Sequence, residues 1–161
     1  MKTKTNLFKK MSLAAAVITI IAIGSGCSKK SDTPTPKANY TVSGNASGAQ
    51  EVPPVSNTAT GSIAGTFNPN NNQFIFTTTW VGLSGAPVSG GFYNGATGTN
   101  GTLSGDLWVF PAGVTGSGSL TDTLTLTSDQ ATQLTSGSLY YSYGTTLNPT
   151  GEIRGQITAT R

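Results

Sequence analysis

Apolar residues recur at every second position through most of the chain from Tyr40 onward. In "NQFIFTTTWVGL" (72–83), Phe74 and Phe76 fall on one face of an extended segment and Ile75 falls on the other. This period of two is typical of β-strands that bury one side. The same alternation predicts strands in five further stretches: 61–67, 101–110, 119–127, 136–144 and 151–159. In 101–110, the residues at the odd positions are Leu103, Leu107 and Val109, and they are expected to share one face.

Turn-forming residues separate these stretches. "NPNNN" (68–72) favours a hairpin loop, "NGATGTNG" (94–101) a longer loop, and "LNPTG" (147–151) a tight turn,. Strands this short, joined by such turns, predict a mostly β fold. The expected architecture is an antiparallel Greek-key β-sandwich or barrel of about seven to eight strands.

One segment, "TSDQATQLTSG" (127–137), departs from the alternation. Ser128 is a candidate N-cap, Asp129 would lie in the first turn, and Gly137 would end a helix,. The segment therefore predicts one short helix around 128–136.

The first 39 residues differ in character from the rest. A cationic start is followed by the apolar run "MSLAAAVITIIAI" (11–23), which is shorter than the roughly 20 residues that a spanning helix needs,. Residues 1–26 are therefore interpreted as a signal peptide, with an uncleaved anchor as the alternative. Residues 27–39 contain two prolines and three lysines without apolar periodicity, which predicts a disordered tether,. Residues 40–161 are expected to form the folded domain.

The apolar run is followed by "IGSGC", which ends at Cys27, the single cysteine of the chain. This sequence resembles the lipobox of bacterial lipoproteins, although Gly24 stands where the usual pattern has leucine. The resemblance implies that Cys27 is acylated and that the mature protein is exported and lipid-anchored in the cell envelope, at the outer membrane or cell surface. Its partner would then be the membrane itself, because two or three acyl chains hold a protein there stably.

The charges are few and unevenly placed. The chain has nine Lys and Arg residues and a formal net charge of +3. Seven of the cationic residues precede Tyr40, however, and the remainder has two arginines against five carboxylates. A basic face that could neutralise a row of phosphates is therefore lacking, which argues against nucleic-acid binding.

Histidine is absent from the sequence. With a single cysteine as well, the chain has no means of forming an internal disulfide, a Cys/His zinc site, or a nucleophilic site that depends on histidine. No cofactor, metal or catalytic residue is expected. Asp106, Asp122 and Asp129 are too widely spaced for a single calcium loop, although a weak calcium site formed by distant carboxylates stays open,.

Two segments together resemble a known family. "SGAQEVPPVSNTATGSIAGTF" (47–67) and "LTSDQATQLTSGSLYYSYGTTLNPTGEIRGQI" (126–157) are similar to the CHRD domain, a β-rich module that occurs in chordin and in secreted bacterial proteins. The resemblance runs from about Ala46 to Ile157. It implies a CHRD-domain protein of the bacterial lipoprotein type.

The chain departs from that family at three positions. Bacterial CHRD domains typically carry a His-x-His-Gly motif and a further histidine before the terminal turn. Here Phe92 and Asn94 occupy the first two positions and Gly144 the third. Any metal or proton chemistry of those histidines is therefore not expected in this chain.

The segment "GEIRG" (151–155) contains Glu152 and Arg154, a conspicuous pair in a sequence so poor in charge. A catalytic role would need a further acid or base nearby, and none is evident. On a strand the two side chains would share a face, while the flanking glycines would let neighbouring segments approach. A structural role is favoured, in which Arg154 binds carbonyls of the preceding turn and Glu51 is a second carboxylate partner.

These observations favour a non-enzymatic, lipid-anchored module of the cell envelope, with a structural role or a protein or glycan partner. The alternative is a metal-binding or superoxide-dismutase-like protein that has lost its histidine site.

Overall fold

The computed structural model describes residues 35–161; Cys27, the expected signal peptide and most of the expected tether lie outside this range. The described residues form nine strands, one α-helix and one 3₁₀ turn. The strands are β1 (Tyr40–Ser47), β2 (Thr60–Asn68), β3 (Gln73–Val81), β4 (Pro87–Asn94), β5 (Thr102–Leu103), β6 (Gly118–Thr125), β7 (Leu139–Thr145), β8 (Ile153–Gln156) and β9 (Thr158–Thr160). The 3₁₀ turn η1 spans Gly48–Gln50, and the helix α1 spans Ser128–Ser136. Within residues 35–161, no helix is long and apolar enough to cross a membrane.

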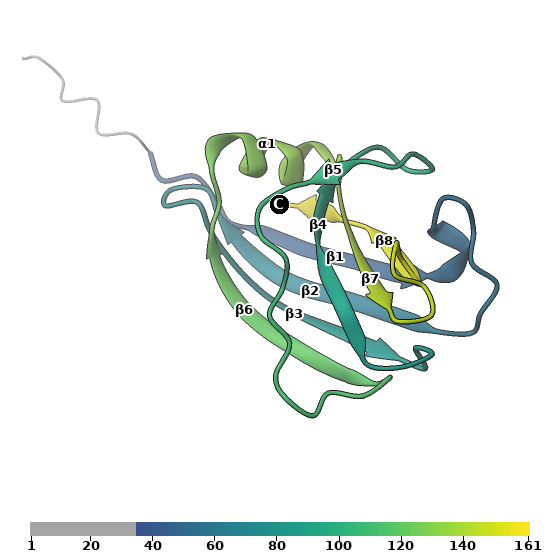
Figure 1. Ribbon diagram of the computed structural model, residues 1–161. Helices are drawn as coiled ribbons and strands as arrows, with labels where there is room; N and C mark the ends of the chain where they lie inside the picture. Colours follow the sequence, from purple (N-terminus) through teal and green to yellow (C-terminus); the bar gives the residue numbers. More distant parts are fainter. Residues whose placement is uncertain (1–34) are drawn as a thin grey trace, which may run out of the picture. The chain divides into compact units, whose positions relative to one another are not determined.

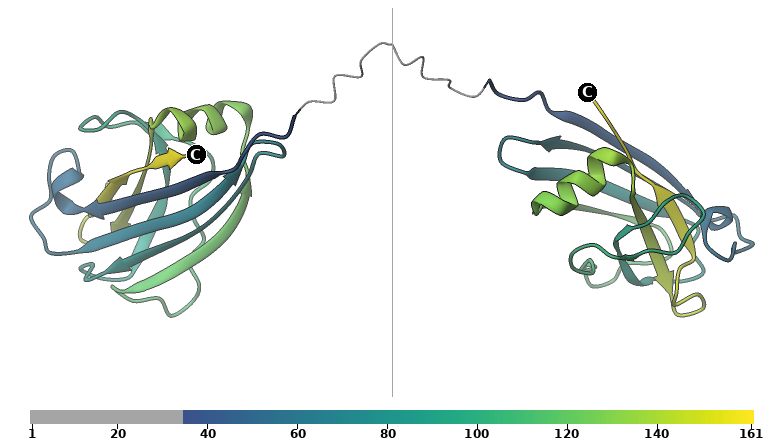
Figure 2. Two further views of the ribbon diagram at one scale, coloured as in Figure 1. Left: turned by 180° about the vertical axis from the view of Figure 1, so that it is seen from behind. Right: turned by 90° about the horizontal axis from the view of Figure 1, so that it is seen from above.

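All strands belong to one antiparallel sheet in the order β5-β4-β7-β8-β1-β2-β3-β6, with β9 also paired to β1. The sheet curls into a half-barrel, so that β4 and β7 cross over the layer formed by β1, β2 and β3 (Figure 1). Figure 2 shows the same curl from behind and from above. The predicted mostly β, antiparallel fold is confirmed, as a single curled sheet.

The core fills the inside of this curl. β3 contributes Phe74, Phe76 and Trp80, all at most 1% exposed, and β7 contributes Tyr141 and Tyr143. These rings contact one another and a further group of aromatic residues on β4 and after β5, namely Phe92, Trp108 and Phe110. The predicted alternation in 72–83 is confirmed, because Ile75 faces outward.

The segment 101–110 differs from the prediction. Only Thr102–Leu103 form a strand, and Leu103, Leu107 and Val109 are exposed. The reason is that Trp108, at an even position, donates its backbone N–H to the carbonyl of Gly90 and packs its ring into the aromatic core. Burying the large indole ring outweighs burying the aliphatic residues on the other face.

The helix forms where the sequence predicted it, with one correction at its start. Thr127 is the N-cap in place of Ser128: its hydroxyl accepts from the Gln130 N–H, and the Gln130 side chain accepts from the Thr127 N–H. This capping box satisfies backbone donors at the start of the helix. Gly137 ends the helix in a left-handed conformation, as expected,.

Candidate functional site

Arg154 lies near the middle of the sheet, because β8 runs between β7 and β1. It is paired with Ser142 on one side and with Ser47 on the other. Since η1 follows Ser47 directly, the sheet brings Glu51 to the neighbourhood of Arg154. The two segments on which the family resemblance depends therefore meet at one place.

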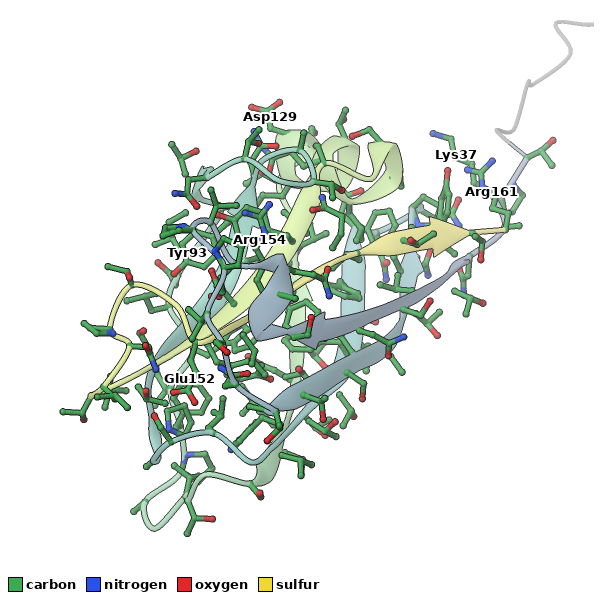
Figure 3. All side chains as sticks on the ribbon, turned by 90° about the vertical axis from the view of Figure 1, so that its right-hand side faces the viewer. Lys37, Tyr93, Asp129, Glu152, Arg154 and Arg161 are labelled. Carbon is green, nitrogen blue, oxygen red and sulfur yellow. The ribbon has the colours of Figure 1, made fainter. Side chains whose placement is uncertain are left out.

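The guanidinium of Arg154 is almost fully buried, with 2% of the residue exposed. Its Nη1 donates to the carbonyl oxygen of Thr99 at 2.7 Å, and its Nη2 donates to that of Ala96 at 3.0 Å. The guanidinium carbon also lies 3.5 Å from the centre of the Tyr140 ring, whose other neighbour is the stacked ring of Tyr93. Figure 3 labels Arg154 and Tyr93 in the same part of the domain. Arg154 therefore binds the loop after β4. The sequence had suggested instead that it would bind the turn before β8.

Glu51 is buried beside Arg154. Its Oε1 accepts from the hydroxyl of Ser142 at 2.8 Å. Burial raises the pKa of the Glu51 carboxyl above its usual value, while the Ser142 hydrogen bond and the positive charge of Arg154 act in the opposite direction,. Glu51 was expected to be a carboxylate partner of Arg154, and its charge does lie near the guanidinium. The hydrogen bonds of both side chains, however, are made with neutral groups.

Two glycines make this arrangement sterically feasible. A Cβ atom on Gly151 would lie 2.5 Å from Oε1 of Glu51, and one on Gly155 would lie 2.7 Å from the backbone oxygen of Asn45. Gly151 also has a φ of +145°, which side chains disfavour,. The glycines of "GEIRG" therefore allow the close approach that the sequence predicted.

Glu152 does not join this group. Its carboxylate accepts from the backbone N–H of Ser84 at 2.7 Å, from the Ser84 hydroxyl at 2.6 Å, and from the hydroxyl of Thr145. Burial acts to raise its pKa, but the hydrogen bonds from Ser84, Thr145 and Asn148 outweigh this and lower the pKa,. Figure 3 places Glu152 well apart from Arg154. Glu152 joins the β3–β4 loop to the end of β7, which is a separate structural role.

A pocket of about 350 Å³ opens above Arg154. One side is formed by the segment 49–54 and the other by Thr97 and Gly98, with Gln156 also in its lining. The two sides are tied together, since Asn100 donates its side-chain amide to the carbonyl oxygen of Val52. We call this hollow the Glu51–Arg154 pocket.

The family model described as the CHRD domain matches residues 42–157. The chain belongs to the CHRD domain family. No curated protein and no solved structure matches it significantly. The match includes the whole Glu51–Arg154 pocket, so the pocket belongs to the CHRD domain itself.

The three positions at which histidines were expected from the family resemblance do not converge. Phe92 is buried in the aromatic core, and Asn94 ends the same strand. Gly144 pairs with Ser89, five residues away from Asn94 along β4. A Cβ on Gly144 would meet Ser89 and the turn carbonyls of 148–149, whereas Phe92 points into the core. A side chain at position 144 would therefore point to the face opposite that of Phe92. Gly144 pairs with Ser89, which is three residues from Phe92, so at about 3.3 Å per residue the two positions are also separated along the sheet,.

A second, larger cavity of about 650 Å³ lies between β6 and the segment after β5. It is lined by Asp106 and Asp122 and by apolar residues that include Trp108. The indole N–H of Trp108 is buried and has no hydrogen-bond partner among the described residues. Within residues 35–161, the carboxylates form no cluster of three that could hold a metal ion.

The sequence did not single out several groups that hold the pocket's side chains in place. Ser142 donates to Glu51, the carbonyls of Ala96 and Thr99 accept from Arg154, and Gln156 donates to the carbonyl of Gly95. Strand pairing could have indicated Ser142, because it lies directly opposite Arg154. The loop carbonyls carry no residue-specific signal.

Proposed function

We propose that this CHRD domain is a non-enzymatic binding module of the cell envelope, held on the membrane through acylated Cys27. The main observation behind the proposal is the set of hydrogen bonds that the buried charges form. Arg154 binds loop carbonyls, and Glu152 binds backbone and hydroxyl donors of a loop and a strand end. Hydrogen bonds of this kind stabilise the loops, and they account for both side chains without a catalytic role.

The fixed loops give the proposal its second support. The segments on both sides of the Glu51–Arg154 pocket are held by hydrogen bonds to Arg154 and between the loops. A preformed surface pocket binds a partner with less ordering cost than a mobile one. A protein or a glycan of the envelope is the class of partner that fits an exported, anchored domain.

Binding to isolated envelope fractions tests the proposal. The Cys27→Ser variant, which has no acyl chains, should bind the fractions through its domain, and pretreatment with protease or with periodate identifies the partner as protein or glycan. Partitioning of wild type and Cys27→Ser between water and a detergent phase tests the anchor, since the acylated wild type should enter the detergent phase and the variant should stay in water. Failure of the variant to bind any envelope fraction would overturn the binding role, and equal partitioning of the two proteins would overturn the anchor.

A further inference from the structure

Both charged side chains of the Glu51–Arg154 pocket have atoms that can form further hydrogen bonds. Within residues 35–161, the one hydrogen bond that Glu51 receives comes from Ser142 and goes to Oε1, which leaves Oε2 without a donor. Arg154 uses two of its five N–H donors, on Thr99 and Ala96,. A ligand in the pocket can therefore find both an acceptor and a donor.

Gln156 also lines the pocket and has an unpaired side-chain oxygen. Its Nε2 donates to the carbonyls of Gly95, Gly137 and Leu139, so its orientation is fixed. Its Oε1 is consequently held in place, is buried, and has no partner among the described residues. Buried polar atoms of this kind are rare in native structures and call for an explanation, such as a bound group.

The charges of the pocket select against ionic ligands. The lining contains one carboxylate, Glu51, and one guanidinium, Arg154. A cation would gain from Glu51 but be repelled by Arg154, and an anion would experience the reverse. A neutral group that both donates and accepts hydrogen bonds satisfies both side chains.

The shape of the pocket limits the size of that group. Its volume of about 350 Å³ is at the small end of ligand sites, which are roughly 300–1,000 Å³,. The segment 49–54 and the loop at Thr97 and Gly98 enclose it from two sides, so it admits one compact ring more readily than an extended chain. Val52 and Pro54 provide apolar wall against which the C–H groups of such a ring can pack.

We infer that the Glu51–Arg154 pocket binds a single sugar residue, whose hydroxyls donate to Glu51 and accept from Arg154. Hydroxyl groups are suited to this pair of partners because each is both donor and acceptor. The inference rests on the proposed binding function and names the ligand class of the same site.

Titration of the ¹⁵N-labelled full-length protein with free monosaccharides tests this inference by NMR. The probes are glucose, galactose, mannose and N-acetylglucosamine, with acetamide as an amide that lacks hydroxyls. At least one sugar should shift the amide signals of residues 49–52, 97–98 and 154–156 in a saturable manner. Glu51→Gln should weaken this binding about tenfold or more, as expected for the loss of a charged hydrogen bond.

Two surface variants control for effects on folding. Thr97→Trp places a large ring at the mouth of the pocket on an exposed residue, and should abolish the shifts. Thr58→Trp makes the same change at an exposed residue outside the lining, and should leave them intact. Thr97→Trp therefore tests the pocket even if Glu51→Gln fails to fold.

The outcomes separate this inference from the broader function. Saturation by acetamide alone would overturn the sugar and leave an amide-binding pocket. The absence of any shift, with envelope binding retained, would place the binding function elsewhere on the domain. The absence of both would overturn the inference and the proposed function together.

Discussion

Replacement of Arg154 by alanine tests the structural role of the one buried cation among residues 35–161. The change removes two hydrogen bonds from a charged donor, each contributing about 1.5–3 kcal/mol,. The acceptors belong to Ala96 and Thr99, which are exposed residues, so water can replace part of each bond and the low end applies. Loss of the contact with Tyr140 adds about 0.5–1 kcal/mol,. The expected fall in the free energy of unfolding is about 3.5–4 kcal/mol.

Urea unfolding followed by the fluorescence of the buried Trp80 and Trp108 measures this quantity. Arg154→Lys should lose about half as much, because an ammonium lacks the planar fork that reaches both carbonyls. Arg161→Ala is the matched control, since Arg161 also lies over a tyrosine ring, Tyr40, but is exposed. Its effect should stay within about 0.5 kcal/mol. A loss below 1 kcal/mol for Arg154→Ala would refute the structural role, and would make recognition its function if partner binding were lost.

The remaining predictions concern Cys27, the two buried glutamates, metal content and Asp122. Intact-mass analysis of native protein should show acylated Cys27 as the first residue; a free thiol or a retained Met1 would contradict this. The lowered pKa of Glu152 adds stability that is present above its unfolded pKa and is lost as the pH falls through its folded pKa,. The raised pKa of Glu51 has the opposite effect, because the stability of the domain falls as the pH rises through the titration of this carboxyl,. Glu152→Gln should therefore flatten the loss of stability in acid and Glu51→Gln should relieve the loss towards neutral pH, as read from urea unfolding between pH 3 and 8; unchanged profiles would contradict both assignments. Elemental analysis after dialysis, followed by copper, zinc and calcium titration, should reveal no stoichiometric metal, and retained metal would reopen the enzyme alternative. Asp122→Thr should promote self-association in sedimentation experiments, because Asp122 puts a charge on the inner side of an edge strand opposite Phe76; a strictly unchanged sedimentation profile would contradict this role,.

Period-two alternation was sufficient to predict several strands because their burial is one-sided. β2, β3 and β6 lie within 61–67, 72–83 and 119–127 to within a residue or two, and the loops at 68–72, 94–101 and 147–151 separate strands as expected. β4 was not assigned, since Gly90 and Gly91 at its centre carry no hydrophobic signal. In 101–110, both the odd and the even positions hold large apolar residues, so alternation could not decide which face is buried.

The candidate site was predictable in its residues but not in its contacts. Glu51, Glu152 and Arg154 stood out because charges are rare in the chain, and all three are buried. Their partners are mostly backbone carbonyls, backbone N–H groups and hydroxyls, which occur throughout this sequence. Only the pairing of β8 with both β7 and β1 shows that Glu51 and Arg154 belong to one pocket and Glu152 to another set of contacts.

β7 is buried along its whole length, although it belongs to a sheet whose other strands mostly expose one face. Tyr141 and Tyr143 face the aromatic core, while Tyr140 on the opposite face lies under Arg154 and Ser142 is bonded to Glu51. β4 and β8 occupy its two edges. Local opening of β7 would have to break the contacts on both of its faces and at both of its edges, so we expect its amide protons to exchange with solvent mainly through unfolding of the entire domain. Among the described residues, we therefore expect the strand that supports the pocket to have the slowest amide hydrogen exchange.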